Sequence, residues 1–308
     1  MARSERANII FGKIMEIGTK ETTRTEEAAA KGLAALRAAG PAPYRLPGLK
    51  RLCLELKDCT LAGMRTFIFK EEKFSKDKPV VVYLAGGCYM LEPQPEHFYM
   101  AESFAQESDC PVYIPLYPKS VSSTFTECYD KMLDFYKLLL KKADPEQIIF
   151  AGDSAGGGLS LGFSEWLVEL GLPKPGKLVL ISPWVDVMTD NPYIAEGVYE
   201  QEDPLLSAEG LKYLGRQWAG DEKDLHNYRL SPMFGNLKEL PPMIVIYGGY
   251  EVFCPDLRRF VQMAKDFGAR IVAHEWPEMF HDFIIFRMPE ADEAKKIVFD
   301  ELRDPDLF

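Results

Sequence analysis

Apolar residues recur along the chain in two alternating patterns: short continuous runs, and stretches with the spacing of a helix. The continuous runs have the composition of strands buried on both faces of a sheet, and they lie at residues 80–84, 111–114, 148–151, 177–181, 243–247 and 270–274. Helical spacing then appears over about residues 125–139, 159–170, 256–267 and 289–302. Repeated strand-then-helix units predict an α/β fold with a mostly parallel sheet and helices on both faces.

The first part of the chain has helical spacing before any strand is predicted. Two helices are expected within residues 4–39, separated at Gly18, and Thr23 with Glu26 resembles a capping box at the start of the second helix. Two further strands, joined near Gly63, are expected at residues 52–56 and 64–69.

The alternation of strands and helices stops between residues 187 and 230. This segment is rich in charged residues and tyrosine and has one strong helical pattern, over about residues 207–218, so we interpret it as an inserted lobe. The predicted organisation is an N-terminal helical segment (1–47), a first part of the sheet domain (48–186), the insertion (187–230) and a second part of the sheet domain (231–308).

Composition and charge narrow the classes of protein. The chain has 308 residues, 47% of them hydrophobic and 27% charged, as is typical of a globular protein. Its net charge of −11 argues against a nucleic-acid or anionic-membrane partner. The six cysteines are spread singly, which favours reduced thiols over a disulfide framework or a metal site. With no signal-like segment and no apolar run of about eighteen residues, we expect a cytoplasmic protein without a membrane span.

The strand at residues 148–151 leads into the sequence Gly152-Asp153-Ser154-Ala155-Gly156, and helical spacing begins soon afterwards. A strand, a Gly-x-Ser-x-Gly turn and a helix form the context of a nucleophile elbow, in which the serine hydroxyl stands clear of the backbone. Ser154 is therefore the predicted nucleophile.

Other strand ends carry residues that suit a nucleophilic serine. The N–H groups of Gly86, Gly87 and Cys88, after the strand at residues 80–84, are expected to bind an oxyanion together with that of Ala155. Glu251 follows the strand at residues 243–247 and is placed to orient a histidine.

Among the four histidines, only His281 is expected in a loop after a late core strand. His97 and His226 are expected in a helix or in the inserted lobe and are interpreted as surface groups, and His274 is expected within a strand. The order Ser154, Glu251, His281 is that of α/β-hydrolase triads.

Two alternatives concern the residues of this triad. Asp256 is the second candidate for the acid, although its position suits a helix N-cap better. A chymotrypsin-like arrangement would need His and Asp before the serine on an all-β chain; only His97 precedes Ser154, and the chain is α/β, so that arrangement is excluded.

These motifs resemble the hormone-sensitive-lipase-like branch of α/β-hydrolases, which includes bacterial acetyl esterases and steryl acetyl hydrolase-like proteins. The resemblance covers nearly the whole chain from about residue 50, and its motifs lie at residues 85–87, 152–157, 181–186, 240–242 and 280–283. It implies that the two helical segments form a cap over the site. The family's first loop usually reads His-Gly-Gly-Gly, whereas here Ala85 and Cys88 stand at its first and last positions.

The resemblance implies a serine esterase that hydrolyses small carboxylic esters through an acyl-enzyme and without a cofactor or metal. Its partner is then a small-molecule ester, and a homodimer is compatible with the sequence. Tyr89, Trp184 and Phe280 are the main candidates for an apolar substrate pocket, to which Met90, Met279, Ile10, Phe11 and Ile14 are added. Two alternatives stay open: an amidase or peptidase with the same triad, and a ligand-binding protein on a hydrolase frame.

Overall fold

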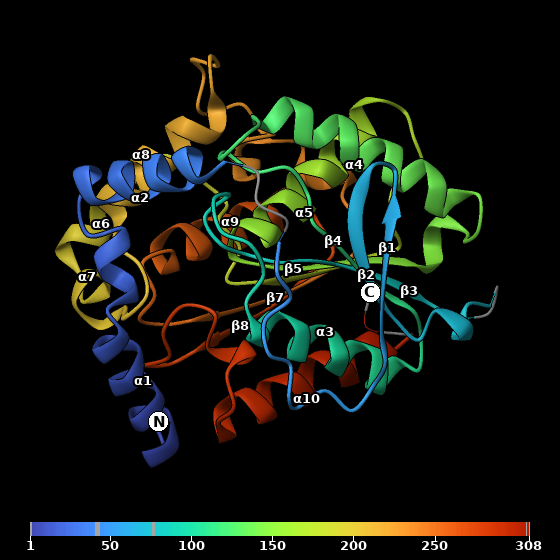
Figure 1. The fold of residues 1–308 in the computed structure, drawn as a ribbon, viewed down its shortest axis with the longest axis horizontal. Coiled ribbons are helices and arrows are strands. Elements are labelled where there is room, and N and C mark those ends of the chain that lie inside the picture. Colours follow the sequence, from blue (N-terminus) through green and yellow to red (C-terminus); the bar gives the residue numbers. More distant parts are fainter. Residues whose placement is uncertain (1, 41–43, 76–77, 306, 308) are drawn as a thin grey trace.

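The computed structural model describes residues 2–40, 44–75, 78–305 and 307. Its centre is one eight-stranded sheet (Figure 1), whose strands are β1 (Leu56–Leu61), β2 (Met64–Phe69), β3 (Val80–Leu84), β4 (Val112–Pro115), β5 (Ile148–Asp153), β6 (Lys177–Ile181), β7 (Met243–Gly248) and β8 (Ile271–Trp276). The strands follow the order β1-β2-β4-β3-β5-β6-β7-β8. β1 and β2 pair antiparallel, as do β2 and β4, and every other pair is parallel. The predicted α/β fold with a mostly parallel sheet is confirmed.

Two layers of helices cover the sheet, one on each face (Figure 1). One layer holds α4 (Phe125–Leu140), α5 (Ser154–Glu169) and α9 (Cys254–Asp266), and the other holds α3 (Pro95–Ser108) and α10 (Pro289–Arg303). Side chains alternate between the two layers along β3, where Val80 and Val82 join one apolar cluster and Val81 and Tyr83 join the other. Burial on both faces explains why this strand is apolar throughout.

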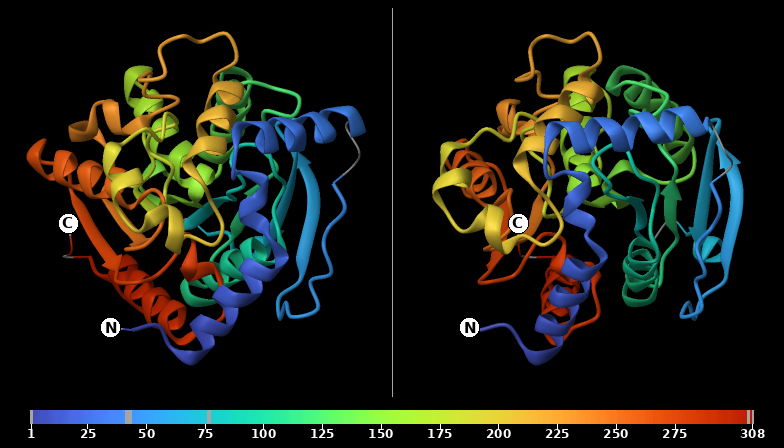
Figure 2. Two further views of the ribbon diagram at one scale, coloured as in Figure 1. Left: turned by 90° about the vertical axis from the view of Figure 1, so that its left-hand side faces the viewer. Right: turned by 60° about the vertical axis from the view of Figure 1, so that its left-hand side comes forward.

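Two segments far apart in sequence form a helical cap at one side of the sheet (Figure 2). The N-terminal segment contributes α1 (Glu5–Ile17) and α2 (Glu26–Ala39), and the insertion contributes α6 (Pro192–Glu196), α7 (Tyr199–Glu202) and α8 (Ala208–Ala219). The two segments are joined at Thr23, which accepts hydrogen bonds from the backbone N–H groups of Ser207 at its Oγ1 (3.1 Å) and of Gly210 at its carbonyl oxygen (2.9 Å). Short 3-10 helices complete the chain at Thr19–Thr22, Glu71–Lys73, Pro145–Gln147, Pro232–Phe234, Leu237–Glu239 and Phe283–Ile285.

Two of the predicted boundaries differ from the observed ones for clear physical reasons. The strand expected at residues 52–56 begins only at Leu56, because the N–H groups of Cys53 and Leu54 donate to the Glu102 carboxylate instead of to a neighbouring strand. The N-cap residue of the second helix is Thr25, whose side chain accepts a hydrogen bond from the Ala28 N–H, and not Thr23. The Thr23 side chain instead accepts a hydrogen bond from Ser207, in the inserted part of the helical cap. No bounds were predicted for α3, the helix that contains His97.

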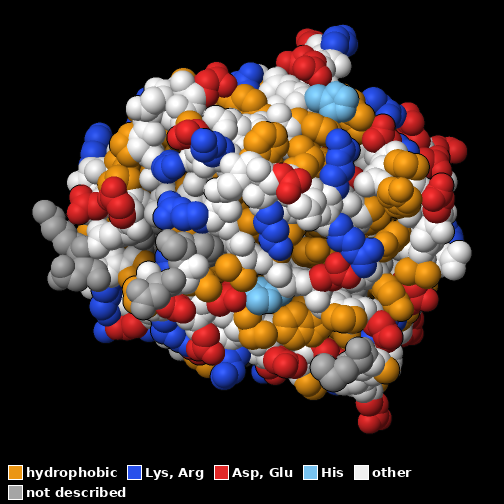
Figure 3. Space-filling model, turned by 180° about the vertical axis from the view of Figure 1, so that it is seen from behind, with side chains coloured by type: hydrophobic (Ala, Val, Ile, Leu, Met, Phe, Trp, Pro, Cys, Tyr) orange, Lys and Arg blue, Asp and Glu red, His pale blue; other side chains and the backbone are white. Residues whose placement is uncertain are grey.

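The outer surface mixes chemical types. Acidic, basic and apolar side chains are interspersed over the face opposite to that of Figure 1 (Figure 3). Within the described ranges, no helix is both long and apolar enough to cross a membrane.

Candidate active site

Ser154 occupies a strained turn between β5 and α5. Its φ of 51° lies in the left-handed region, which a residue other than glycine adopts only where the surroundings impose it. Two glycines make the turn fit, because a Cβ on Gly152 would lie 2.6 Å from the Gly156 backbone, and one on Gly156 would lie 1.9 Å from the Leu84 carbonyl oxygen. The backbone geometry of Ser154 is that of a nucleophile elbow.

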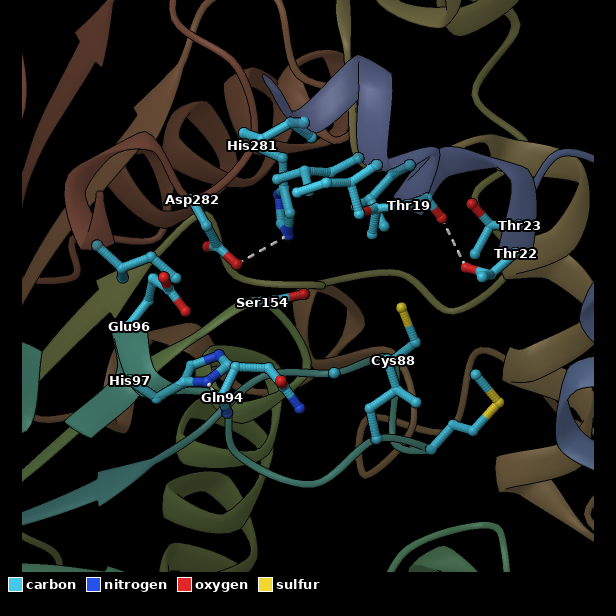
Figure 4. A pocket seen from close by; sticks show the side chains of 18 of the residues that line it. Thr19, Thr22, Thr23, Cys88, Gln94, Glu96, His97, Ser154, His281 and Asp282 are labelled. Atoms are coloured by element: carbon cyan, nitrogen blue, oxygen red, sulfur yellow. Dashed lines mark hydrogen bonds and ion pairs between the residues drawn. The ribbon is translucent and has the colours of Figure 1, made fainter. Parts of the chain in front are cut away.

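Ser154 opens into a cavity of about 340 Å³ between the sheet and the cap. Loops after β3 and β8 supply one part of its wall, and the cap supplies another through residues that include Ile14, Thr23 and Leu206. Figure 4 shows the Ser154 side chain in the middle of this space, with His281 and Asp282 on one side and His97 and Cys88 on the other. The cavity therefore brings together residues from five separate parts of the chain.

Glu251 and His281 face each other at the bottom of the site. His281 Nδ1 lies 3.5 Å from Glu251 Oε1, and both side chains are buried. At this separation neither of the two atoms has a hydrogen-bond partner among the described residues. The other carboxylate oxygen, Oε2, accepts from Ser182 Oγ at 2.6 Å and from the Gly248 N–H at 2.8 Å. These two donors fix the carboxylate so that its remaining oxygen faces the imidazole.

A second carboxylate contacts the other side of the same imidazole. Asp282 Oδ2 lies 3.1 Å from His281 Nε2, which is the ring nitrogen that does not face Glu251 (Figure 4). The Asp282 N–H donates to Ser182 Oγ at 3.2 Å, so this one hydroxyl links the Asp282 backbone to the Glu251 carboxylate. The sequence gives His281 one acidic partner, and the structure gives it two.

The two carboxylates dominate the protonation of His281. Burial alone lowers the pKa of His281, but the charges of Asp282 and Glu251 outweigh it and hold that pKa well above its usual value. Burial also raises the pKa of the Asp282 carboxyl to about 7, although the adjacent imidazole opposes the rise. The protonation of His281 and that of Asp282 therefore depend on each other.

The loop after β3 presents only part of its backbone to the cavity. Gly87 and Cys88, with φ of 128° and 54°, line the cavity next to Ser154. The Gly86 N–H instead donates to Asp153 Oδ2 at 2.9 Å, so it is already bound within the protein. Burial raises the pKa of the Cys88 thiol to about 12, which keeps its sulfur protonated at neutral pH.

His97 is the main residue that the sequence interpretation misplaced. It is 8% exposed rather than a surface group, it lines the cavity, and its Nε2 lies 3.2 Å from Asp153 Oδ2. The expectation failed because the sequence pattern did not show that the helix containing His97 packs on the sheet and buries this side chain. Asp153 inside the elbow motif was the available signal, since a buried carboxylate needs nearby donors.

The three main pocket candidates lie in the core. Tyr89 stacks on Trp218 with ring centroids 4.3 Å apart and on Trp184 at 5.6 Å, and Phe280 packs edge-on against Phe11 at 6.0 Å. All three candidates are almost fully buried, and none lines the cavity around Ser154. Of the additional candidates, Met90 and Ile14 line the cavity, whereas Met279, Ile10 and Phe11 belong to the apolar packing.

The remaining ionisable candidates lie elsewhere. Asp256 is not the N-cap of α9, which begins two residues earlier; it is buried, and its Oδ1 accepts from Asn191 Nδ2 at 2.8 Å. His226 is largely exposed, and His274 lies in β8 beside Glu301, as the sequence indicated. In the part of the chain that the structure describes, no group of three or more His, Cys, Asp or Glu side chains is arranged to hold a metal ion.

Comparison with known proteins agrees with this architecture. The sequence model of the family described as having the α/β-hydrolase fold matches residues 81–285, which include the elbow, Glu251 and His281. The chain therefore belongs to the α/β-hydrolase fold family, and the family resemblance inferred from its motifs is confirmed.

Named relatives are hydrolases. The chain is 29% identical over 225 residues to an acetyl-hydrolase of Streptomyces hygroscopicus, covering 72% of this chain and 74% of that protein. It is 27% identical over 259 residues to an esterase of Acinetobacter venetianus, covering 80% and 84%. Among solved structures, a putative esterase from Staphylococcus aureus has the same fold, with a TM-score of 0.86, 24% identity and coverage of 93% and 96%. An esterase from the bacterial hormone-sensitive lipase family gives a TM-score of 0.81, 24% identity and coverage of 98% and 99%.

Proposed function

We propose that this protein is a serine esterase that hydrolyses small carboxylic esters through an acyl-enzyme on Ser154. The observation that carries the proposal is the strained elbow at Ser154, which opens into the same cavity as His281. Glu251 lies on the other side of the imidazole, next to Nδ1. The relatives named acetyl-hydrolase and esterase support it. A cavity of about 340 Å³ suits a small acyl group and a small alcohol.

The proposed reaction is a double displacement. His281 Nε2 takes the proton of the Ser154 hydroxyl as the oxygen attacks the ester carbonyl, and Glu251 stabilises the imidazolium that forms. His281 then protonates the leaving alcohol, and water attacks the acyl-enzyme by the same route. In this scheme His281 must exchange its contact with Asp282 for one with Ser154.

The oxyanion is assigned to the N–H groups of Gly87, Cys88 and Ala155. Gly86, a fourth candidate from the sequence, is left out because its N–H is bound to Asp153. Ala155 is the second residue of α5, and the first N–H groups of a helix have no partner inside the helix. Donors of this kind hold the negative charge that develops in the transition state.

A fluorophosphonate probe tests the proposal directly. We expect stoichiometric labelling, with the added mass on the peptide that contains Ser154, because only an activated serine reacts at an appreciable rate. Heat-denatured protein is the control and should stay unlabelled. Native protein that remains unmodified would contradict the esterase and would favour a protein that binds ligands without catalysis.

Because Asp282 contacts His281, we expect an unusual dependence of activity on pH. General-base catalysis needs an unprotonated Nε2, and a raised pKa keeps the proton on the imidazole to higher pH, so kcat/KM should rise with pH through and beyond neutrality. The variant Asp282→Asn removes the charge that raises this pKa most. Its activity profile should therefore move to lower pH by about one pH unit.

The measurement is kcat/KM for p-nitrophenyl acetate between pH 5 and 9, corrected for spontaneous hydrolysis. Glu239→Gln is the matched control, since it removes an exposed carboxylate just before β7, at the opposite end of that strand from Glu251. Its profile should overlay that of the native protein. An unchanged midpoint in Asp282→Asn would show that Asp282 does not control the protonation of His281.

A further inference from the structure

The loop at residues 85–88, called the oxyanion loop below, is hydrogen-bonded to side chains from other parts of the chain. Its first side chain is only the methyl group of Ala85, and two of its residues have positive φ. Two polar bonds anchor its start: Tyr117 Oη donates to the Ala85 carbonyl oxygen at 2.6 Å, and the Gly86 N–H donates to Asp153 Oδ2 at 2.9 Å. The position of the next two N–H groups, which are assigned to the oxyanion, therefore depends on where Asp153 is held.

Asp153 is fully buried, and its carboxylate collects three donors. Tyr83 Oη donates to Oδ1, while the Gly86 N–H and His97 Nε2 both approach Oδ2. Burial raises the pKa of Asp153, but His97 and the other donors outweigh it and keep the pKa below its usual value. The carboxylate is therefore ionised, and an ionised group in the core stays in place only while its donors stay.

The hydrogen bonding of His97 defines which nitrogen carries its proton. The Gln94 N–H donates to His97 Nδ1 at 2.8 Å, at the start of α3, so Nδ1 has no proton of its own. The ring proton is consequently on Nε2, 3.2 Å from Asp153 Oδ2. His97 is thus a donor that α3 directs at Asp153.

We infer that His97 is a positioning residue for the oxyanion hole. It acts through Asp153: the imidazole holds the carboxylate, the carboxylate holds the Gly86 N–H, and the fixed Gly86 leaves the N–H groups of Gly87 and Cys88 directed at the cavity. This inference rests on the proposed function, because the oxyanion is the one that forms on an ester attacked by Ser154.

Two conservative variants separate the two bonds of His97. Asparagine places its amide near the position of Nδ1, so His97→Asn keeps an acceptor for Gln94 and loses the donor to Asp153. Glutamine reaches the position of Nε2, so His97→Gln keeps a donor to Asp153. Both variants are polar and close to histidine in size, and they differ in the bond that carries the inference.

The kinetic expectation is a selective loss in the transition state. We expect kcat of His97→Asn to fall about 10- to 100-fold with KM changed little, because oxyanion donors act mainly after attack. His97→Gln should stay within about threefold of the native protein. The affinity for a trifluoromethyl ketone, which forms a tetrahedral oxyanion on the serine, should fall in parallel with kcat/KM. If His97 had a purely structural role, the melting temperature of both variants would fall, and the affinity for the ketone would not follow kcat/KM.

Amide hydrogen exchange tests the same inference without any turnover. Peptides that cover residues 85–88 should exchange at least about tenfold faster in His97→Asn than in the native protein, and those of His97→Gln should exchange as in the native protein. Native exchange in His97→Asn would overturn the inference, whether or not the protein hydrolyses esters. If the native protein does not hydrolyse esters but the loop of His97→Asn exchanges faster than that of the native protein, the proposed function alone is overturned.

Discussion

Replacing Ser154 by alanine should reduce the turnover of p-nitrophenyl acetate by at least about 1,000-fold. The residual rate would be the one that substrate binding and the oxyanion donors support without the serine nucleophile. The expected loss is large because the proposed mechanism uses no nucleophile other than the Ser154 hydroxyl. Cys88 also lines the cavity, but burial raises its pKa to about 12 and leaves it a neutral thiol. The measurement is the initial rate under saturating ester, with the fold checked by thermal unfolding.

Ser164→Ala provides the matched control for this variant. Ser164 lies on the same helix, and its hydroxyl donates to the Ser160 carbonyl oxygen at 2.8 Å, remote from the reaction in the proposed scheme. The control should keep turnover within about twofold while losing a comparable hydroxyl. Substantial turnover by Ser154→Ala would rule out the acyl-enzyme and require a different nucleophile.

Replacing the proposed acid of the triad, Glu251, should also have a large effect on kcat. Glu251→Gln is expected to lower kcat by about 10²- to 10⁴-fold, because an amide in place of the carboxylate neither fixes the imidazole tautomer nor stabilises the imidazolium. Ser182 and Gly248 donate to Oε2, so the amide nitrogen of the variant is directed to the Oε1 position, facing His281 Nδ1. This would favour the tautomer with its proton on Nε2, which cannot accept from Ser154.

Asp256→Asn is the counterpart that distinguishes the two acid candidates. The Asp256 carboxyl is bound to Asn191, and burial raises its pKa to about 7, so an amide there changes little. Its kcat should remain within about threefold of the native value, since among the described residues its side-chain hydrogen bond is to Asn191 and not to the imidazole. A severe loss in Asp256→Asn together with near-native Glu251→Gln would reverse the assignment.

The sequence was sufficient for features that depend on local pattern. The elbow around Ser154 needs one strand, one helix and small residues at fixed offsets, all of which are visible within a dozen positions. Alternating apolar runs likewise identified the parallel strands, because a strand buried on both faces must be apolar along its whole length. Glu251 and His281 followed from the rule that functional groups gather at the carboxyl ends of parallel strands.

Features that depend on side-chain direction were not predictable in this way. Tyr89 follows the oxyanion loop directly, yet its φ of 53° turns the chain so that the ring stacks on Trp218 in the core. The contact between His97 and Asp153 joins two elements 56 positions apart, and no pattern within either one reports it. Asp282 was part of a recognised motif, but its contact with the His281 imidazole required the loop geometry, including its own φ of 55°.

The joining of the cap at Thr23 has a consequence for the passage of molecules. Because the turn between α1 and α2 is bonded to the backbone at the start of α8, the two parts of the cap are tied to each other above the sheet. Thr23 and Leu206 also line the cavity, so the joint lies directly above the bound ester in the proposed reaction. In the proposed reaction, the alcohol and the acid then leave past a lid built from residues 5–39 and 192–219. Thr23 holds this lid together along with Lys20, which donates to the Asp203 carbonyl oxygen, and Arg216, which pairs with Glu26.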